Sequence, residues 1–297
     1  MKEIIECIPN VSEGRRSDVI NEIVQNLQKT GVKVLDYSSD PDHNRSVITF
    51  VGDKETVKKG ALQVAKDAVR LIDLTKHHGT HPRMGAVDVI PFVPIKGVTM
   101  KDCVEISKEV GKEIAEELNV PVYLYAESAT TPQRVKLPNI REGEFEGFFE
   151  KIKKPEWKPD FGKPEVHPTA GVVAVGAREF LIAYNINLNT TDLKIAKKIA
   201  RSIRESSGGL RYIQAKGMEL KDKGCVQVSM NILNYKKAPL YRVFEIVKME
   251  AERYGVNVLE SELIGLMPMD AALKSLAFYM QFPKLTSDRI VESKIYE

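Results

Sequence analysis

The spacing of apolar side chains predicts that strands and amphipathic helices alternate along the chain. Short runs rich in β-branched residues are typical of strands, and apolar positions every three or four residues are typical of helices. In the first half the pattern predicts strands at 3–9, 32–37, 45–52, 87–94 and 120–127, with helices at 17–31, 53–74 and 100–118. The two prolines of the strand at 87–94 favour a place at a sheet edge or strand end.

The second half repeats this order. It predicts a strand at 179–188, a helix at 190–206, a hairpin formed by 210–220 and 225–233, a helix at 240–255 and a strand at 258–268. Both halves therefore contain the order β-α-β-β-α-β of the ferredoxin-like motif. We predict an α+β fold of two ferredoxin-like subdomains, residues 1–176 and 177–297, with a substrate cleft between them.

The segment 151–171 lies between the two repeats and cannot form regular structure for long. Its prolines and glycines interrupt both helices and strands. One interpretation is a plain linker. The other is an ordered inter-subdomain loop that lines the cleft, where small molecules often bind. Trp157 and Phe161 favour the ordered loop, because a mobile linker rarely needs two aromatic side chains.

Composition narrows the class of protein. The 297 residues are 43% hydrophobic, which is enough for a packed core, and the net charge of +3 does not indicate a nucleic-acid partner. No apolar run approaches the roughly 20 residues that span a bilayer, and the N-terminal residues lack the apolar region of a signal peptide. We expect a cytoplasmic protein without a membrane partner. The three cysteines form no CxxC pair, and we expect them to be buried.

Three of the five histidines, His77, His78 and His81, lie within the stretch HHGTH. Their spacing allows a metal site, and the stretch matches the first five positions of the HxGTHxD signature of metal-dependent amidohydrolases. However, Gly79 and the proline after His81 disfavour a helix. Arg83 stands where that signature has its aspartate ligand, and a guanidinium repels a cation. We therefore expect no metal here.

Acid–base chemistry fits the same stretch better. An imidazole can accept and return a proton near neutral pH, which makes His81 a candidate general acid and base. Arg83 could bind a substrate carboxylate through its planar fork. A second polar cluster occupies 36–46, and Asp36 is its member that we expect to face a site because it closes an apolar strand. The start of the helix at 17–31 is a further candidate for anion binding.

Nine motifs together resemble the formiminotransferase family, whose domain also occurs fused to a cyclodeaminase. They are ECIPNVSEG at 6–14, NRSVITFVG at 44–52, HHGTHPRMGAVDVIPFVPIKGVTM at 77–100, VPVYLYAESA at 120–129, EWKPDFGKP at 156–164, VGAREFLIAYNINL at 175–188, RYIQAKGM at 211–218, VQVSMNILNY at 226–235 and SELIGLMP at 261–268. The resemblance spans nearly the whole chain, and we expect no cyclodeaminase part.

The resemblance implies an activity and its residues. The formimino group of N-formimino-L-glutamate would pass to N5 of tetrahydrofolate, the co-substrate, in histidine degradation. The products would be 5-formiminotetrahydrofolate and L-glutamate. The family's catalytic histidine corresponds to His81, and the family is commonly a homodimer. The residues that correspond to its folate-binding segment are Gly162, Lys163, Pro164, Glu165, Val166, His167, Pro168, Thr169, Ala170 and Gly171. His167 and Pro168 stand where mammalian members have other residues.

One position departs from the family. The family has an acidic residue that is proposed as the partner of its catalytic histidine. In this sequence Ser38 stands at that position. Asp36 or Asp40 could take over the task of orienting His81. Three other functions stay open at this point: formyl transfer between 5-formyltetrahydrofolate and glutamate, metal-dependent hydrolysis of formiminoglutamate, and folate binding without catalysis.

Overall fold

The computed structural model describes residues 3–295, which form two compact units that divide between Arg178 and Glu179. Each unit has its own sheet and its own hydrophobic core. The structure thus confirms a mixed α and β architecture with two sheets. The division falls two residues beyond the boundary expected from the sequence.

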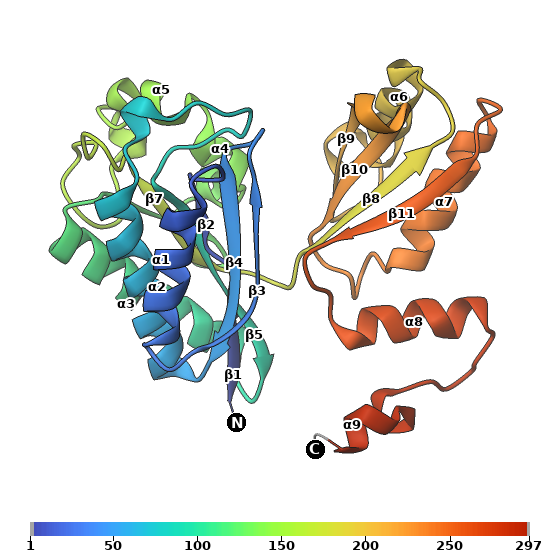
Figure 1. The fold of residues 1–297 in the computed structure, drawn as a ribbon, viewed down its shortest axis with the longest axis horizontal. Coiled ribbons are helices and arrows are strands. Elements are labelled where there is room, and N and C mark those ends of the chain that lie inside the picture. Colours follow the sequence, from blue (N-terminus) through green and yellow to red (C-terminus); the bar gives the residue numbers. More distant parts are fainter. Residues whose placement is uncertain (1–2, 296–297) are drawn as a thin grey trace. The chain divides into compact units, whose positions relative to one another are not determined.

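The first unit contains seven strands and five α-helices among its described residues (Figure 1). They are β1 (Ile4–Cys7), β2 (Asn10–Val11), α1 (Ser17–Gln28), β3 (Lys33–Asp40), β4 (Arg45–Gly52), α2 (Lys54–Leu71), β5 (Val87–Lys96), α3 (Met100–Leu118), β6 (Val122–Ala126), α4 (Leu137–Arg141), α5 (Glu144–Lys151) and β7 (Val173–Ala177). Sequence periodicity had indicated all of these except β2, β7, α4 and α5.

The sheet of the first unit begins with β3 beside β4. β1 and β2 follow one another between β4 and β5, and all of these neighbours are antiparallel. β7 then pairs in parallel with β5 on one side and with β6 on the other. The strands therefore run in the order β3, β4, β1 with β2, β5, β7 and β6.

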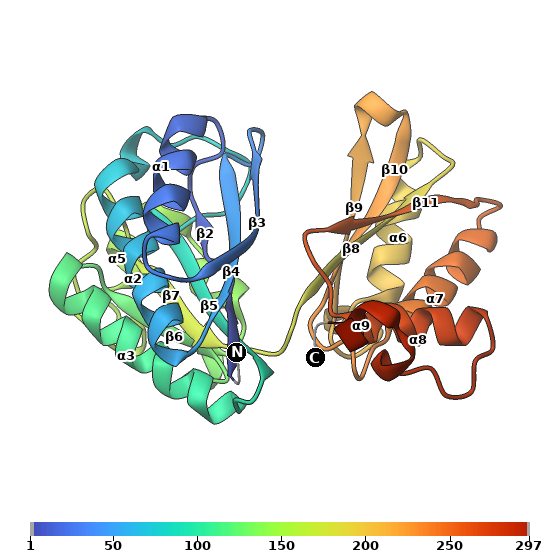
Figure 2. The same ribbon diagram turned by 60° about the horizontal axis from the view of Figure 1, so that its bottom comes forward.

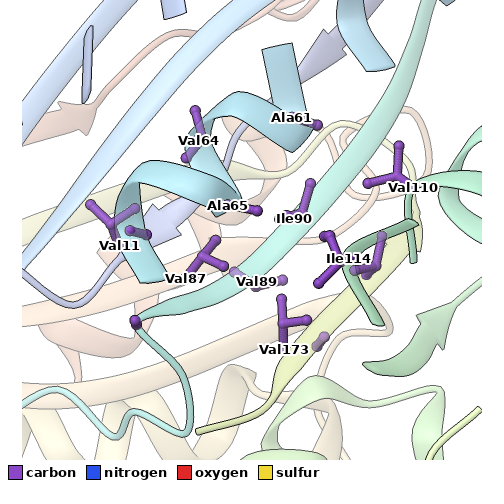
Figure 3. Close-up of a cluster of buried hydrophobic side chains, with 14 of the residues drawn as sticks. Val11, Ala61, Val64, Ala65, Val87, Val89, Ile90, Val110, Ile114 and Val173 are labelled. Carbon is purple, nitrogen blue, oxygen red and sulfur yellow. The ribbon is translucent and has the colours of Figure 1, made fainter. Parts of the chain in front are cut away.

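α1, α2 and α3 cover one face of this sheet (Figures 1 and 2). Each is amphipathic, and the buried residues of α2 include Val64 and Ala65. Figure 3 shows these side chains in one buried cluster with Val87 of β5, Ile114 of α3 and Val173 of β7. Asp53 caps α2 by accepting a hydrogen bond from the backbone N–H of Thr56 at 2.8 Å, which supplies one partner that the first turn lacks.

The prolines favoured a sheet edge or a strand end, but β5 is an interior strand and Pro91 lies in its middle, so this prediction was wrong for Pro91. Pro91 is tolerated because its backbone faces the break between β1 and β2. There its carbonyl oxygen accepts a hydrogen bond from the N–H of Ile8 at 3.3 Å. The missing N–H of Pro91 faces the same side, where Pro9 interrupts the neighbouring strand, so no ladder hydrogen bond is lost.

The second unit has a four-stranded sheet in the order β11, β8, β10, β9, with every neighbouring pair antiparallel. The predicted order β-α-β-β-α-β is present, and the predicted hairpin is the pair β9 and β10. Two helices then follow that the sequence patterns did not indicate. The elements are β8 (Ile182–Leu188), α6 (Leu193–Ile203), β9 (Ile213–Leu220), β10 (Cys225–Ile232), α7 (Leu240–Glu252), β11 (Val258–Ile264), α8 (Met269–Tyr279) and α9 (Val291–Ile295).

Two further sequence expectations concern the described residues as a whole. The three cysteines are free and buried, as predicted. No helix within residues 3–295 combines the length and the apolar character that crossing a membrane would require.

Candidate active site

The histidine loop, residues 77–86, is held against the turn that follows β3. Nε2 of His77 lies 2.7 Å from the carbonyl oxygen of Asn44, and the side-chain amide of Asn44 donates to the carbonyl oxygen of His78 at 3.0 Å. A Cβ atom at Gly79 would lie 2.4 Å from the carbonyl oxygen of His43, so only glycine permits this close approach. The two polar segments singled out in the sequence therefore form one site.

Arg83 is buried, and protein groups already hold its guanidinium. Its Nη2 and Nη1 atoms bind the two carboxylate oxygens of Glu146 at 2.6 and 2.8 Å, and Nη1 also binds Glu144 at 3.2 Å. Its Nε donates to Nδ1 of His77 at 3.2 Å. The hydrogen bond to Glu146 raises the pKa of Arg83. Because its whole fork is occupied, the structure does not support Arg83 as a binder of a substrate carboxylate.

His81 lies at the inner end of the loop and is 8% exposed. Its ring makes no hydrogen bond to any residue of the described part of the chain. The His43 ring meets it edge-on, with 6.4 Å between centroids. The pKa of His81 is lowered to about 2, mainly by burial and to a smaller extent by the positive charges of Arg141 and Arg45. The free protein therefore holds His81 as a neutral imidazole, with one ring nitrogen protonated and the other able to accept a proton.

Neither predicted aspartate contacts this ring. Asp40 accepts from Nδ1 of His43 at 2.7 Å and from the backbone N–H of His43 at 2.9 Å. Asp36 lies opposite Thr49 in the sheet, four residues before Asp40 in β3. The structure thus gives no support to Asp36 or Asp40 as a direct orienter of His81, and Asp40 orients His43 instead.

Two arginines beside His81 were not predicted as site residues. Arg141, at the end of α4, binds Oδ2 of Asp88 through Nε at 2.8 Å and Nη2 at 2.5 Å. Arg45 begins β4, and its buried Nε atom has no hydrogen-bond partner among the described residues. Asp88, alone among apolar neighbours in β5, was a sequence signal for a buried ion pair. Arg45 lay within an ordinary turn, and nothing near Arg141 in the sequence pointed to this site.

The candidate folate segment 162–171 is joined to the histidine loop by backbone hydrogen bonds. The carbonyl oxygen of Ala170 accepts from Ala86 at 2.9 Å, and that of Met84 accepts from Val172 at 2.9 Å. Gly171 has φ of +70°, and a Cβ atom there would lie 2.1 Å from the carbonyl oxygen of Met84. The two segments therefore lie side by side at residues 84–86, directly after Arg83.

Within that segment, residues 167–171 are held by hydrogen bonds and residues 162–165 are exposed. His167 and Gly171 exchange backbone hydrogen bonds of 3.2 and 3.0 Å, and Nδ1 of His167 accepts from the N–H of Ala170 at 3.0 Å. Residues 162–165 are exposed, so Lys163 is accessible to a ligand. The segment precedes β7, an interior strand of the first sheet. It therefore belongs to the first unit, and the chain crosses to the second unit only after β7.

The aromatic residues of 151–171 anchor the loop rather than leaving it mobile. The hydroxyl of Tyr123 donates to the carbonyl oxygen of Trp157 at 2.6 Å, and Phe161 pairs with Val122 through its backbone. The guanidinium of Arg134 also donates to the carbonyl oxygen of Lys158 at 2.5 Å. The interpretation of this segment as a plain linker was therefore wrong.

Two other candidate sites were considered from the sequence: an anion site at the start of α1 and a metal site. The carboxylate of Glu13 accepts from the backbone N–H groups of Arg15 and Arg16, both at 2.9 Å. The start of α1 thus already has its anion, and the anion site predicted there is filled by the protein itself. Within residues 3–295, no group of three His, Cys, Asp or Glu side chains is arranged to hold a metal ion.

A buried histidine flanked by arginines, beside an exposed loop, is an arrangement typical of enzymes that act on small anionic molecules. Comparison with known families is specific. Residues 4–178 match the formiminotransferase domain, N-terminal subdomain, and residues 183–295 match the formiminotransferase domain. The chain therefore belongs to the formiminotransferase family.

Curated relatives cover the chain nearly end to end. Glutamate formimidoyltransferase of Streptococcus pyogenes serotype M1 is 52% identical over 95% of this chain and 94% of that protein. The protein of the same name from Thermoplasma acidophilum is 48% identical over 98% of this chain and 97% of its own length. Formimidoyltransferase-cyclodeaminase of Mus musculus is 46% identical over 96% of this chain, which spans 54% of the mouse protein.

Proposed function

We propose that this protein transfers the formimino group of N-formimino-L-glutamate to N5 of tetrahydrofolate, giving 5-formiminotetrahydrofolate and L-glutamate, a step of histidine degradation. The observation that carries the proposal is the 52% identity, over almost the whole of both chains, with a protein named glutamate formimidoyltransferase. The activity is that of a one-carbon-group transferase that uses tetrahydrofolate as co-substrate.

The reaction forms a bond between N5 and the formimino carbon and breaks the bond from that carbon to the glutamate nitrogen. We assign the proton transfer to His81. Its neutral ring takes the proton released at N5 and returns it to the departing nitrogen, so the leaving group departs as a neutral amine. General acid–base catalysis of this kind contributes about 10² to 10⁴ in rate. Binding both substrates in one site adds the advantage of proximity.

The segment 162–171 is our candidate for folate binding. Its contact with the histidine loop supports this role, because the two segments share backbone hydrogen bonds at Ala86 and Ala170. Lys163 offers an exposed cation for a carboxylate of the folate tail. A homodimer is a further part of the proposal that rests on the family resemblance. A substrate cleft between the two units and a cytoplasmic location are parts that rest on the sequence analysis.

The test is an assay of the purified protein with tetrahydrofolate and N-formimino-L-glutamate, followed by the absorbance of the folate product. Turnover that needs both substrates supports the proposal. N-formylglutamate in place of the formimino donor tests formyl transfer. Glutamate release without tetrahydrofolate, together with stoichiometric metal in elemental analysis, would instead indicate the amidohydrolase. Either formyl transfer in place of formimino transfer or this hydrolysis would overturn the proposal.

A further inference from the structure

The guanidinium of Arg45 lies partly buried beside His81 and makes no hydrogen bond or ion pair with any residue between 3 and 295. Its Nε atom is inaccessible and makes no hydrogen bond to any described residue. Burial first, and then the neighbouring charge of Arg141, lower its pKa. A guanidinium has only donors to offer, and a buried donor without an acceptor is costly and rare. The Nη groups of Arg45 also make no hydrogen bond to a described residue and are not fully buried, so an acceptor from outside the chain can reach this part of the fork.

The nearby carboxylates are not available to Arg45, because other groups hold them. Asp88 is held by the two N–H groups of Arg141 at 2.8 and 2.5 Å. Asp40, which lies opposite Arg45 in the sheet, is held by the ring of His43 at 2.7 Å. Once these pairs are formed, Arg45 is the cation beside His81 that lacks an anion. A carboxylate matches its planar fork with two parallel hydrogen bonds.

We propose that Arg45 binds a carboxylate of the formimino donor and that this carboxylate allows His81 to hold a proton during transfer. This inference rests on the proposed function. It assigns the carboxylate to the donor because the donor's α-carboxylate is attached to the carbon that bears the departing nitrogen. The carboxylates of a folate tail lie beyond the aminobenzoyl group, far from N5, where His81 must act.

The electrostatic consequence follows from the groups that surround the ring. In the free protein, burial is the main cause that disfavours a charged imidazole at His81. Unfavourable electrostatic interactions add to this effect, and they come from Arg141, Arg45, His43 and His77. A carboxylate bound to Arg45 offsets the positive charge of this arginine near the ring, which raises the pKa of His81. His81 would therefore become an effective base only after the donor has bound.

The kinetic test compares Arg45→Gln and Arg45→Lys with the wild-type enzyme. We expect KM for formiminoglutamate to rise about 10- to 100-fold in Arg45→Gln, because a charge-assisted hydrogen bond to the donor is lost. KM for tetrahydrofolate should stay within about twofold, and Arg45→Lys should recover part of the loss. Arg253→Gln is a matched control, because Arg253 is exposed and pairs with Glu250 within its own helix region.

A second test needs no turnover. The Cε1–H signal of His81, assigned by comparison with His81→Gln, is followed by NMR against pH with and without L-glutamate, the reaction product. We expect no titration of His81 between about pH 5 and 8 in the free protein and a midpoint within or near that window with saturating glutamate. Arg45→Gln should bind glutamate weakly by calorimetry and show no such response. An unchanged His167 signal would show that the variant is folded.

The outcomes are distinguishable. An unchanged donor KM in folded Arg45→Gln, or a His81 signal that ignores glutamate, overturns the inference while the proposed function stands. A raised KM for tetrahydrofolate alone would assign Arg45 to the folate tail and would also overturn it. If the wild-type protein does not turn over formiminoglutamate but glutamate still binds through Arg45 and shifts His81, the proposed function fails and the carboxylate site remains.

Discussion

The Nε atom of Arg83 lies 3.2 Å from Nδ1 of His77, whose Nε2 lies 2.7 Å from the carbonyl oxygen of Asn44. His77 must therefore accept at Nδ1 and donate at Nε2, which defines its neutral tautomer. Burial, as the main cause, lowers its pKa in agreement with that state. His77 links the arginine to the turn after β3, and both residues shape the site rather than react in it.

Replacing Arg83 should therefore affect stability more than substrate binding. Arg83→Ala removes the hydrogen bonds to His77, Glu144 and Glu146, and we expect it to cost about 2 to 3 kcal/mol of unfolding free energy in urea. Lys153→Ala removes an exposed ion pair to Glu150 and should cost less than about 1 kcal/mol. A stable Arg83→Ala enzyme with a donor KM raised about tenfold would restore the carboxylate-binding role.

His81→Ala should lower kcat by about 10² to 10⁴ while tetrahydrofolate binds as before, because only the proton transfer is lost. His78→Ala is the matched control, since His78 is exposed and contributes only its backbone carbonyl to the site. Steady-state kinetics and calorimetry with folate measure the two effects. If turnover of His81→Ala stays within about threefold of wild type, the role assigned to His81 is wrong.

Lys163→Glu should weaken folate binding about five- to tenfold at low salt, because it exchanges an exposed attractive charge for a repulsive one. Calorimetric titration at two salt concentrations should show a smaller effect at the higher one. Lys29→Glu makes the same charge change on a lysine at the end of α1 that bonds only Asn26. Equal affinities for both variants would count against placing folate at 162–171.

Gly79→Ala should impair catalysis, because the added Cβ would displace the backbone of His43 and shift the histidine loop. Misplacement by about 1 Å can cost about 10² in rate, so we expect a fall in kcat of at least tenfold. Gly147→Ala, in α5, meets open space. It should leave kcat unchanged and stabilise the helix by up to about 1 kcal/mol. Equal activity of the two variants would show that the close approach at Gly79 does not matter.

Glu6 should make stability depend on pH. It is 3% exposed, its Oε2 has no partner among the described residues, and burial raises its pKa to about 7 despite the charge of Arg178. Between about pH 4.5 and 7 the folded chain keeps a proton that the unfolded chain has lost. Stability should therefore fall by up to about 3 kcal/mol as pH rises through that window.

Urea unfolding at several pH values measures this change. Glu6→Gln should remove most of the fall, because its amide does not titrate. Glu109→Gln, which changes an exposed carboxylate on α3, should keep it. The assignment to Glu6 does not hold if Glu6→Gln shows the same dependence on pH as the wild-type protein.

Local periodicity was sufficient to predict much of the fold. Amphipathic helices such as α1 and the hairpin of β9 and β10 follow directly from the spacing of their apolar residues. It failed where a distant partner decides the structure. Pro91 argued for an edge strand, and only the break at Pro9 on the neighbouring strand shows why β5 can be central.

The same distinction applies to the site. The loop of His81 was recognisable because its chemistry is concentrated in a few consecutive residues. The partners of Arg83 lie 61 and 63 residues further along the chain, and Asp88 meets Arg141 across 53 residues. No local pattern could show that Arg83 is already bound while Arg45 is not, because that difference arises only when the loops fold together.

The strand β7 follows the segment 162–171 and lies between β5 and β6. The candidate folate loop and the histidine loop are therefore built into the same sheet. The distance between these two loops is therefore set within the first unit, so under our proposal the alignment of N5 with His81 depends on one sheet alone.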